Sequence, residues 1–299
     1  SCKFIGNHSY RSGVSHIQSG ATPVFTNCLF ENNNSNYVIS VSSNWESKVI
    51  YNGCKFYNND CYQNTNIITN FGTTGSIFWN VGDTRFSHCY FYENNVDNST
   101  YEQEYAAIIF NRDSLTVENC VFASNLINYG AAIYGWDTSF TTIDLSTFFD
   151  NGGVVEPSFR GTSTSDLKIR NSIFSDRGSF RYTEGTYNIQ NSCSDKGSVA
   201  VGSGTMTNFI SSDPLFYDEM NLKGADTIFG TSDDGLRLKN GSPCINKGNK
   251  ALSTDTVADI LGNSRIYNDT IDMGAYEYQP YSPGSALSFS GTNEHITLP

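Results

Sequence analysis

The sequence has few positive charges, few charged residues of any kind and no long hydrophobic run. Its 299 residues include 18 Lys and Arg against 30 Asp and Glu, which gives a formal net charge of −12. Because binding to nucleic-acid phosphates needs clustered cations, this composition argues against a nucleic-acid partner. No stretch of about 18 apolar residues is present, so a membrane-spanning helix is excluded.

Several catalytic and metal-binding patterns are also missing. The chain has only four His residues and no Cys and His spacing typical of zinc sites, and it lacks phosphate loops, metalloprotease motifs and serine nucleophile elbows. By contrast, it contains 33 Asn, 26 Gly, 20 Phe and 18 Tyr. The aromatic residues are numerous enough for a hydrophobic core, so we expect a folded chain whose surface is polar through amides and hydroxyls.

A short pattern recurs along the chain: Cys or Ser, then any residue, then Phe, with Asn three residues after the Phe. It begins at seven positions: Cys2, Cys28, Cys54, Cys89, Cys120, Ser146 and Ser172. The steps between them are 26, 26, 35, 31, 26 and 26 residues, and Arg177 breaks the Asn series in the last repeat. Such a period indicates a repeat architecture.

The residue before each Cys or Ser marks a bend. This position is mostly Asn or Gly, which tolerate a left-handed backbone, and it is occupied by Asn27, Gly53, His88, Asn119, Leu145 and Asn171. Apolar and polar residues alternate on both sides of the bend, and the alternation slips by one residue at the bend itself. Short strands that turn such corners predict a parallel β-helix, in which equivalent residues stack about 4.8 Å apart.

In that arrangement the Phe residues form an interior stack, and the Asn residues form a ladder of amides that satisfies backbone groups at a corner. An α-helical solenoid is excluded because no 3.6-residue apolar stripe appears. The calcium-binding nonapeptide β-roll is excluded because its glycine pattern is absent.

These patterns resemble known families. The coils, together with the GAAIYG segment at 130–135, resemble bacterial right-handed parallel β-helix proteins, which include lyases, glycosidases, tailspikes and adhesins. Residues 213–216 (DPLF), 241–248 (GSPCINKG), 262–265 (GNSR) and 271–277 (IDMGAYE) resemble the C-terminal end of choice-of-anchor Q proteins. Residues 285–299 resemble the opening of a laminin-G or concanavalin-like module. The resemblance implies a secreted or cell-surface bacterial protein.

The predicted fold class is therefore all-β, a right-handed parallel β-helix with a C-terminal capping region. We expect coils over residues 1–212, a region over 213–280 that caps the open end of the last coil, and a linker and the start of a β-sandwich-like module over 281–299. A cap is needed because a bare last coil exposes unpaired strand edges. Since residue 1 falls inside a repeat, we expect the sequence to be an excerpt of a longer protein.

The cysteines divide into two groups. Five of the eight, Cys2, Cys28, Cys54, Cys89 and Cys120, share a repeat position that Ser146 and Ser172 occupy in later coils. We interpret this column as a buried ladder of unpaired thiols that act as small apolar side chains. The sequence leaves open whether Cys61, Cys193 and Cys244 form disulfides.

Three tryptophans are candidate ligand-binding residues. Trp45, Trp79 and Trp136 precede the Cys or Ser of their coils by nine or ten residues, with Phe110 in the same place between them. Aromatic rings along one ridge of a rod could hold the apolar faces of sugars. The alternative is an ordinary buried aromatic ladder.

An acidic loop is the candidate metal site. Asp226, Asp233 and Asp234 lie among glycine bends, and carboxylate and carbonyl oxygens are the ligands that calcium prefers. Calcium is therefore the one cofactor that the sequence suggests, although the residue order of an EF-hand is absent. The alternative is a turn-rich loop in which Asp acts as a turn former.

The sequence favours a non-catalytic role without deciding the question. β-Helix lyases need a basic residue and cations to act on uronates, and no lyase motif is recognisable. A glycosidase needs two carboxylates about 5–10 Å apart, and Asp83, Asp113 and Asp137 fall near equivalent corners of successive coils.

We therefore predict a non-catalytic rigid stalk or adhesin segment of a large secreted or cell-surface bacterial protein. Its expected partners are glycans, other surface proteins and the neighbouring modules of its own chain. The alternatives are a carbohydrate-active β-helix enzyme, either a polysaccharide lyase or a glycosidase, and a sugar-binding module without turnover.

Overall fold

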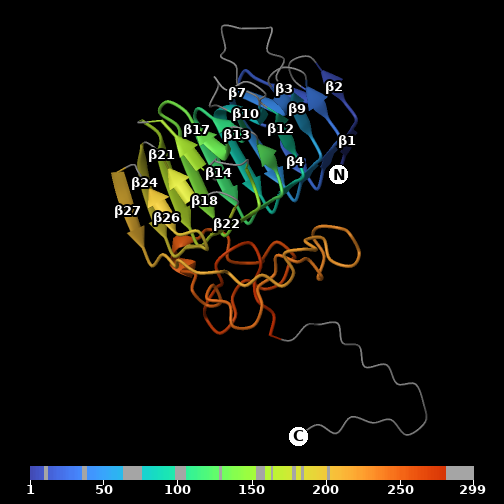
Figure 1. Cartoon of the computed structure of the whole chain (residues 1–299). Helices are drawn as coiled ribbons and strands as arrows, with labels where there is room; N and C mark the ends of the chain where they lie inside the picture. The colour runs from blue at the N-terminus through green and yellow to red at the C-terminus, as the bar shows by residue number, and fades with distance from the viewer. Residues whose placement is uncertain are drawn as a thin grey trace, which may run out of the picture.

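The computed structural model shows a stack of short parallel strands with a strand-poor C-terminal region along one side (Figure 1). The structure describes residues 1–9, 13–35, 39–62, 76–97, 106–127, 130–152, 159–162, 164–176, 180–182, 185–200 and 203–280. All pairings between its named strands are parallel, and each joins equivalent segments of neighbouring coils. The fold is thus the parallel β-helix that the repeat predicts.

Three sheets form the faces of the helix. The eight-stranded sheet contains β1 (Lys3–Ile5), β5 (Leu29–Glu31), β8 (Lys55–Tyr57), β11 (Tyr90–Tyr92), β15 (Val121–Ala123), β19 (Thr147–Phe149), β22 (Ile173–Ser175) and β25 (Cys193–Ser194). The five-stranded sheet contains β2 (His8–Ser9), β6 (Asn34–Ser35), β9 (Asp60–Tyr62), β12 (Asn95–Asp97) and β16 (Leu126–Ile127).

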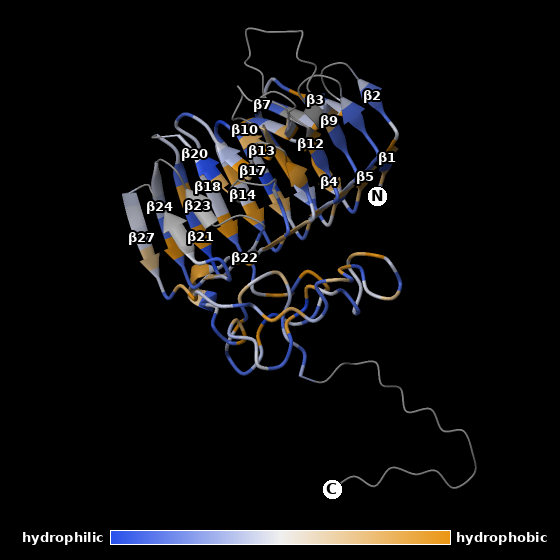
Figure 2. Cartoon of the chain, viewed as in Figure 1, coloured by the Kyte–Doolittle hydropathy of each residue, from blue (hydrophilic) through white to orange (hydrophobic). Residues whose placement is uncertain are grey.

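The twelve-stranded sheet has two wings joined by its two longest strands, β7 (Ile39–Asn52) and β10 (Ser76–Ser87). Around them pair β3 (Ser15–Ile17), β4 (Val24–Thr26), β13 (Ala106–Asn111), β14 (Ser114–Glu118), β17 (Gly130–Gly135), β18 (Phe140–Asp144), β20 (Phe159–Gly161), β21 (Asp166–Arg170), β24 (Thr186–Gln190) and β27 (Ser203–Thr207). A small sheet pairs β23 (Phe180–Tyr182) with β26 (Ser198–Ala200). Hydrophobic bands cross the strands of neighbouring coils (Figure 2).

The predicted bends have the predicted backbone. The six residues before the Cys or Ser column have φ angles between 46° and 63°: Asn27, Gly53, His88, Asn119, Leu145 and Asn171. A second column of left-handed residues, which the sequence analysis missed, precedes the Asn ladder at Gly6, Asn32, Asn58, Glu93, Ser124 and Asp150. Each coil therefore turns two corners, and each corner has one residue in the left-handed conformation. Non-glycine residues adopt this conformation only where the surroundings enforce it.

The interior is an aromatic stack. Strand register places Phe4, Phe30, Phe56, Phe91, Phe122, Phe148 and Phe174 side by side in successive coils. Their ring centroids are 4.2–5.2 Å apart and their planes nearly parallel. A second stack, Phe25, Tyr51 and Phe86, meets the first edge to face. The predicted aromatic column is confirmed, and the second stack fills the space beside it.

The amide ladder is also confirmed, and its hydrogen bonds are complete. In each coil the backbone N–H and the Nδ2 of the ladder Asn donate to the Oδ1 of the next Asn; for Asn94 and Asn125 these distances are 3.1 and 2.8 Å. Asn Nδ2 donates its remaining hydrogen to the carbonyl of the Phe in the preceding coil, as Asn94 does to Phe56 at 3.0 Å. Buried amides are stable only when they are satisfied in this way.

The end of the ladder corrects one prediction. The series does not stop at Asn151, because Asp176 accepts both the N–H and the Nδ2 of Asn151 at 2.9 and 2.8 Å. The last coil step is one residue shorter at this corner, so the acceptor is Asp176 rather than the residue at 177, which lies outside the described part of the chain. A carboxylate suits this place because it receives two donors and has none to give.

We expect Asn94→Ala to lower the free energy of unfolding by about 2–4 kcal/mol, because the buried N–H and Nδ2 of Asn59 would lose their acceptor. Asn52→Ala, at an exposed position of β7, is the matched control and should cost under about 0.5 kcal/mol. Chemical denaturation measures both. Equal losses in the two variants would contradict a structural role for the ladder.

A second, shorter amide ladder lies at another corner and was missed. Asn44 Nδ2 donates to Asn80 Oδ1 at 3.0 Å, and Asn80 Nδ2 donates to Asn111 Oδ1 at 2.8 Å. These residues precede the column cysteines Cys54, Cys89 and Cys120 by 10, 9 and 9 positions. That near-constant offset is the signal by which they could have been found.

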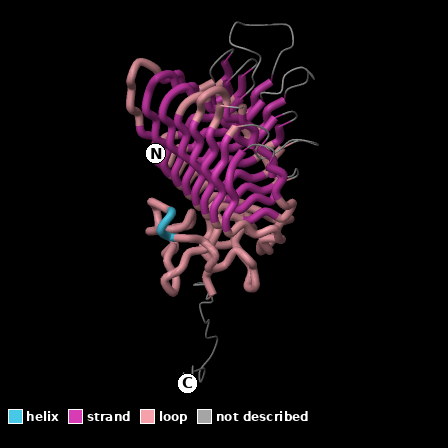
Figure 3. The backbone as a smooth tube through the Cα atoms, turned by 90° about the vertical axis from the view of Figure 1, so that its left-hand side faces the viewer, coloured by secondary structure: helices cyan, strands magenta, loops and turns pink. Residues whose placement is uncertain are grey.

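The C-terminal region lies along the flank of the coils. Residues 213–280 contain one short 3-10 helix, η1 (Lys250–Leu252), and otherwise turns and isolated bridges. Their contacts run from Lys55 of β8 to Asn191 after β24, over the outer face of the eight-stranded sheet and the adjoining ends of β14 and β21 in the twelve-stranded sheet. Figures 1 and 3 show this region lying beside the strands. No described helix is long and apolar enough to cross a bilayer.

This placement differs from the predicted cap over the open end of the last coil. The reason is chemical, because the outer face of β11, β15 and β22 carries large apolar side chains that need cover. We call residues 213–280 the flank region from here on. Residues 281–299, where the sequence predicts the start of a further module, lie outside the described residues.

Candidate functional site

The flank region buries a second hydrophobic core against the coils. Tyr90, Tyr92, Val121, Ala123 and Ile173 project outward from the eight-stranded sheet, and they pack against Phe216, Phe229, Leu236, Leu238 and Met273. Gly274 approaches the sheet so closely that an added Cβ would lie 2.8 Å from both Ile173 Cδ1 and Thr147 Oγ1. The sequence did not show this interface, because these strand residues read as ordinary outward positions.

A buried arginine holds the flank region together. Arg265, fully buried, donates to the carbonyl oxygens of Gly274 and Ala275, both at 3.0 Å, and to the side chain of Asn119 in the coil. It also lies 3.6 Å from the Glu277 carboxylate. The 262–265 and 271–277 segments thus bond to each other through Arg265, and Arg265 also bonds this region to Asn119 of the coil.

A polar row docks residues 249–254 on the outer face of β14, β18 and β21. Arg170 donates to the Leu252 carbonyl at 2.7 Å, and Thr254 donates to Glu118 at 2.7 Å. Asn171 Nδ2 reaches both Asp144, at 3.1 Å, and Ser253, at 2.8 Å. Glu118 and Asp144 are buried, so the protonation of their carboxyl groups depends on the contacts with residues 249–254.

Two buried carboxyl groups have raised pKa values. Burial raises the pKa of Asp144 from 3.8 to about 7, with the nearby Glu118 adding to the rise and Arg170 opposing it. Burial and repulsion from Asp272 raise the pKa of Glu277 from 4.5 to about 8. Both groups keep a proton in the folded protein at pH values where the unfolded chain has released it.

The free energy of unfolding should therefore fall as pH rises from about 4 to about 8, since the folded state binds more protons across this window. We expect the thermal unfolding midpoint at pH 5 to exceed that at pH 8 by about 5 °C or more. Asp144→Asn should reduce this difference, because its amide cannot ionise. A midpoint that rises from pH 5 to pH 8 would contradict the argument.

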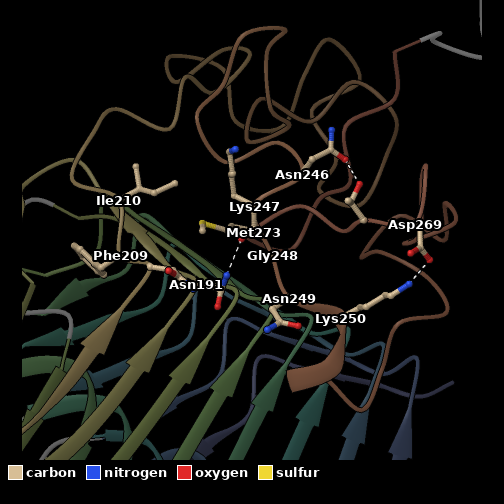
Figure 4. A pocket seen from close by; sticks show the side chains of 12 residues that line it. Asn191, Phe209, Ile210, Asn246, Lys247, Gly248, Asn249, Lys250, Asp269 and Met273 are labelled. Carbon is tan, nitrogen blue, oxygen red and sulfur yellow. Dashed lines mark hydrogen bonds and ion pairs between the residues drawn. The ribbon is translucent and has the colours of Figure 1, made fainter.

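A cleft opens where the flank region meets the last coil. Its volume is about 570 Å³, and its lining comprises Asn191, Asn208, Phe209, Ile210, Asn246, Lys247, Gly248, Asn249, Lys250, Asp269, Thr270 and Met273. Figure 4 shows Asn191 bonded to the backbone of Lys247, at 3.1 Å, and Lys250 paired with Asp269. The cleft combines an apolar floor with amides and an exposed lysine.

The predicted tryptophans gather in one cluster but do not form one stack. Trp79 stacks on Phe110 at 4.5 Å, and Phe110 stacks on Tyr134 at 5.4 Å. Trp136 is tilted beside this stack, and strand register pairs Trp45 with Val81 instead. The sequence analysis missed Tyr134 because the spacing pointed to Trp136 as the next member.

The aromatic stack is covered. Trp79, Phe110 and Tyr134 are only 5%, 2% and 2% exposed, so a sugar ring could not lie flat on them as they stand. The Arg160 guanidinium lies 5.8 Å from the Tyr134 ring, and Trp79 Nε1 has no hydrogen-bond partner among the residues that the structure describes. Sugar binding by Trp45, Trp79 and Trp136 stays a prediction, and the geometry supports a structural role.

The acidic loop uses its carboxylates to bind its own backbone. Asp233 accepts hydrogen bonds from the N–H groups of Ala225 and Asp226 at 2.6 and 3.2 Å. Asp234 is fully buried and accepts from Gly230 N–H at 2.9 Å and Tyr276 hydroxyl at 2.8 Å.

Asp226 closes the neighbouring turn by accepting from Ile228 N–H at 2.8 Å. No three His, Cys, Asp or Glu side chains gather as a metal site within the described ranges. Calcium binding stays a prediction, and these bonds are those of Asp as a turn former.

The three candidate catalytic carboxylates have different surroundings. Asp83 lies 3.5 Å from Lys48, and Asp137 lies 3.7 Å from Arg112, each in a partly exposed ion pair. Asp113 is exposed, and its backbone carbonyl accepts from Phe140 N–H at 2.9 Å. Two of the three therefore form ion pairs with cations, and glycoside hydrolysis by these residues stays a prediction.

Comparison with described protein families and with curated proteins finds no match to this chain.

Proposed function

We propose that this chain is a rigid, non-catalytic stalk segment of a large secreted or cell-surface bacterial protein. The observation that carries the proposal is the continuity of its ladders, in which the Phe stack and the amide ladder run unbroken through the coils from Phe4 to Phe174 and from Asn7 to Asp176. Each coil bonds to both neighbours, so bending the rod would break several buried contacts at once.

The flank region supports the same proposal. It packs on one side of the coils through an apolar core that covers β11, β15, β22 and β25 and through the Arg265 network, which stiffens the rod. Its resemblance to choice-of-anchor Q proteins, whose members are surface-attached, favours an extracellular setting.

The test combines shape and activity. Small-angle scattering of the intact chain should give an elongated, stiff particle, and incubation with neutral and uronate polysaccharides should release no new reducing ends. Release of reducing ends would overturn the stalk proposal in favour of the carbohydrate-active enzyme. Scattering typical of a flexible chain would overturn it as well.

Glycan binding without turnover is the second candidate, and the cleft of Figure 4 favours it. Its volume of about 570 Å³ lies within the roughly 300–1,000 Å³ of typical ligand sites. Asn side chains on its walls can donate to and accept from sugar hydroxyls, and Lys247 can pair with an acidic sugar.

A glycan array tests this candidate directly. Binding of acidic glycans that Lys247→Ala reduces at least about tenfold would support it, with Lys239→Ala, an exposed lysine outside the cleft lining, as the matched control. Unchanged binding in Lys247→Ala, or no binding at all, would reject the cleft as a glycan site.

A further inference from the structure

The eight cysteines serve three different structural purposes. In the repeat column, Cys28, Cys54, Cys89 and Cys120 each point their Sγ at the carbonyl two residues earlier, as Cys120 does to Glu118 at 3.1 Å. Ser146, Ser172 and Ser192 make the same bond in later coils at 2.6–3.0 Å. These four buried thiols therefore act as equivalents of serine, whereas Cys2, at the start of the column, is exposed rather than buried as predicted.

Cys61 belongs to the interior of the helix. It pairs in register with Val96 of the next coil and is fully buried within the main hydrophobic core. Among the described residues, no other cysteine lies in the five-stranded sheet that contains Cys61. Six of the eight cysteines are thus accounted for by the coils themselves.

Cys193 and Cys244 are different, because they come from two separate parts of the fold. Cys193 is in β25, at the end of the eight-stranded sheet, and Cys244 is in the flank region. Both are free thiols, fully buried in the one hydrophobic core between the sheet and the flank region. Cys193 Sγ donates to the Ser212 carbonyl at 3.3 Å, and the Cys193 thiol is the main cause that raises the pKa of Cys244. Met273 N–H donates to the Cys244 carbonyl at 3.1 Å, which fixes the segment that presents this thiol.

We propose that Cys193 and Cys244 are a cross-linking pair, which forms a disulfide between the last coils and the flank region under oxidising conditions. The residues lie 51 positions apart, so the bond closes a long loop that is otherwise held only by noncovalent contacts. Closing a long loop restricts the unfolded chain most, which is where a disulfide gains its effect. The bond would keep the flank region on the coils when the buried carboxyl groups near it ionise.

The chemistry is a thiol–disulfide exchange with a small-molecule disulfide such as oxidised glutathione. The thiolate of one cysteine attacks the oxidant and releases one molecule of reduced thiol, and the second cysteine then displaces the other. One S–S bond breaks in the oxidant and one forms in the protein, while the two protein thiols lose two protons and two electrons. Because both sulfurs are buried once docked, the exchange occurs as the chain folds.

The experiment refolds the intact chain in a glutathione redox buffer or in excess reductant, alkylates the remaining thiols and maps the peptides by mass spectrometry. We expect one cross-linked peptide pair, Cys193 with Cys244, whose mass is lower by two hydrogens, while Cys54, Cys89 and Cys120 are alkylated. Alkylated Cys193 and Cys244 after oxidative refolding, or a cross-link between other cysteines, would overturn the proposal.

The oxidised protein should also unfold about 5–10 °C above the reduced protein. Cys193→Ser and Cys244→Ser should abolish this difference, and Cys120→Ser should preserve it because serine occupies that column in later coils. A difference that survives in Cys193→Ser would show that the stabilising bond lies elsewhere. The peptide map of the unmodified chain decides the case even where a variant fails to fold.

Discussion

Phe122→Ala is expected to lower the free energy of unfolding by about 3–5 kcal/mol. The ring is fully buried and stacks between Phe91, at 4.2 Å, and Phe148, at 4.5 Å, with planes 7° apart in both pairs. Its removal leaves a void in the middle of a stack whose neighbours are held by strand pairing on both sides, so the cavity cannot collapse. Guanidinium denaturation followed by circular dichroism measures the loss.

Phe140→Ala is the matched control, since the same atoms are removed from a ring that is 38% exposed and rests beside Lys168. We expect it to cost under about 1 kcal/mol. A loss under about 1 kcal/mol for Phe122→Ala itself would mean that this ring does not support the coils, and the interior stack would lose its role.

Arg265→Met should have a similar effect, about 3–5 kcal/mol, and it should act on the flank region. The substitution removes the buried donors to Gly274, Ala275 and Asn119 and the cation that lies beside Glu277. Hydrogen exchange should therefore speed up in residues 257–278 while the amides of β11 and β15 stay protected. This pattern distinguishes release of the flank region from unfolding of the coils.

Arg112→Met provides the comparison, because Arg112 forms a partly exposed ion pair with Asp137 and such pairs contribute about 0–1 kcal/mol. If Arg265→Met changes exchange no more than Arg112→Met does, the buried arginine does not anchor the flank region. Uniformly faster exchange over the coils as well would show that the two parts unfold as one unit.

Much of the coil structure could be predicted from residue spacing. The Cys-x-Phe pattern placed Phe30, Phe56 and Phe91 in register, and the bend residues such as Asn119 have the left-handed backbone that the sequence indicated. These features repeat, so one coil predicts the next. A repeat reads reliably because the same few contacts recur at every period.

The predictions that depended on contacts between unlike segments were less complete. Asp176 closes the ladder one position earlier than the repeat suggests, and Tyr134 rather than Trp136 continues the stack on Phe110. Both cases reflect local changes in coil length, which shift register by one or two residues. No single period describes such shifts.

The candidate site residues show the same division. The carboxylates of Asp233 and Asp234 suggest a metal site, yet the structure directs these groups to N–H donors within the loop and to Tyr276. The sequence analysis named Arg265 only as the last residue of the 262–265 segment (GNSR). Its role as a buried anchor required knowing that the segment packs on Asn119.

The amino-acid sequence by itself determined the winding of this protein, because like residues recur at coil spacing and stacking them buries apolar rings and satisfies amides. Only the tertiary structure decided that the C-terminal residues lie along the flank and that Cys193 and Cys244 share one buried core there. The physical reason is that the coils pair through residues one repeat apart in the sequence. The contacts of the flank region join residues that are not separated by any repeat length.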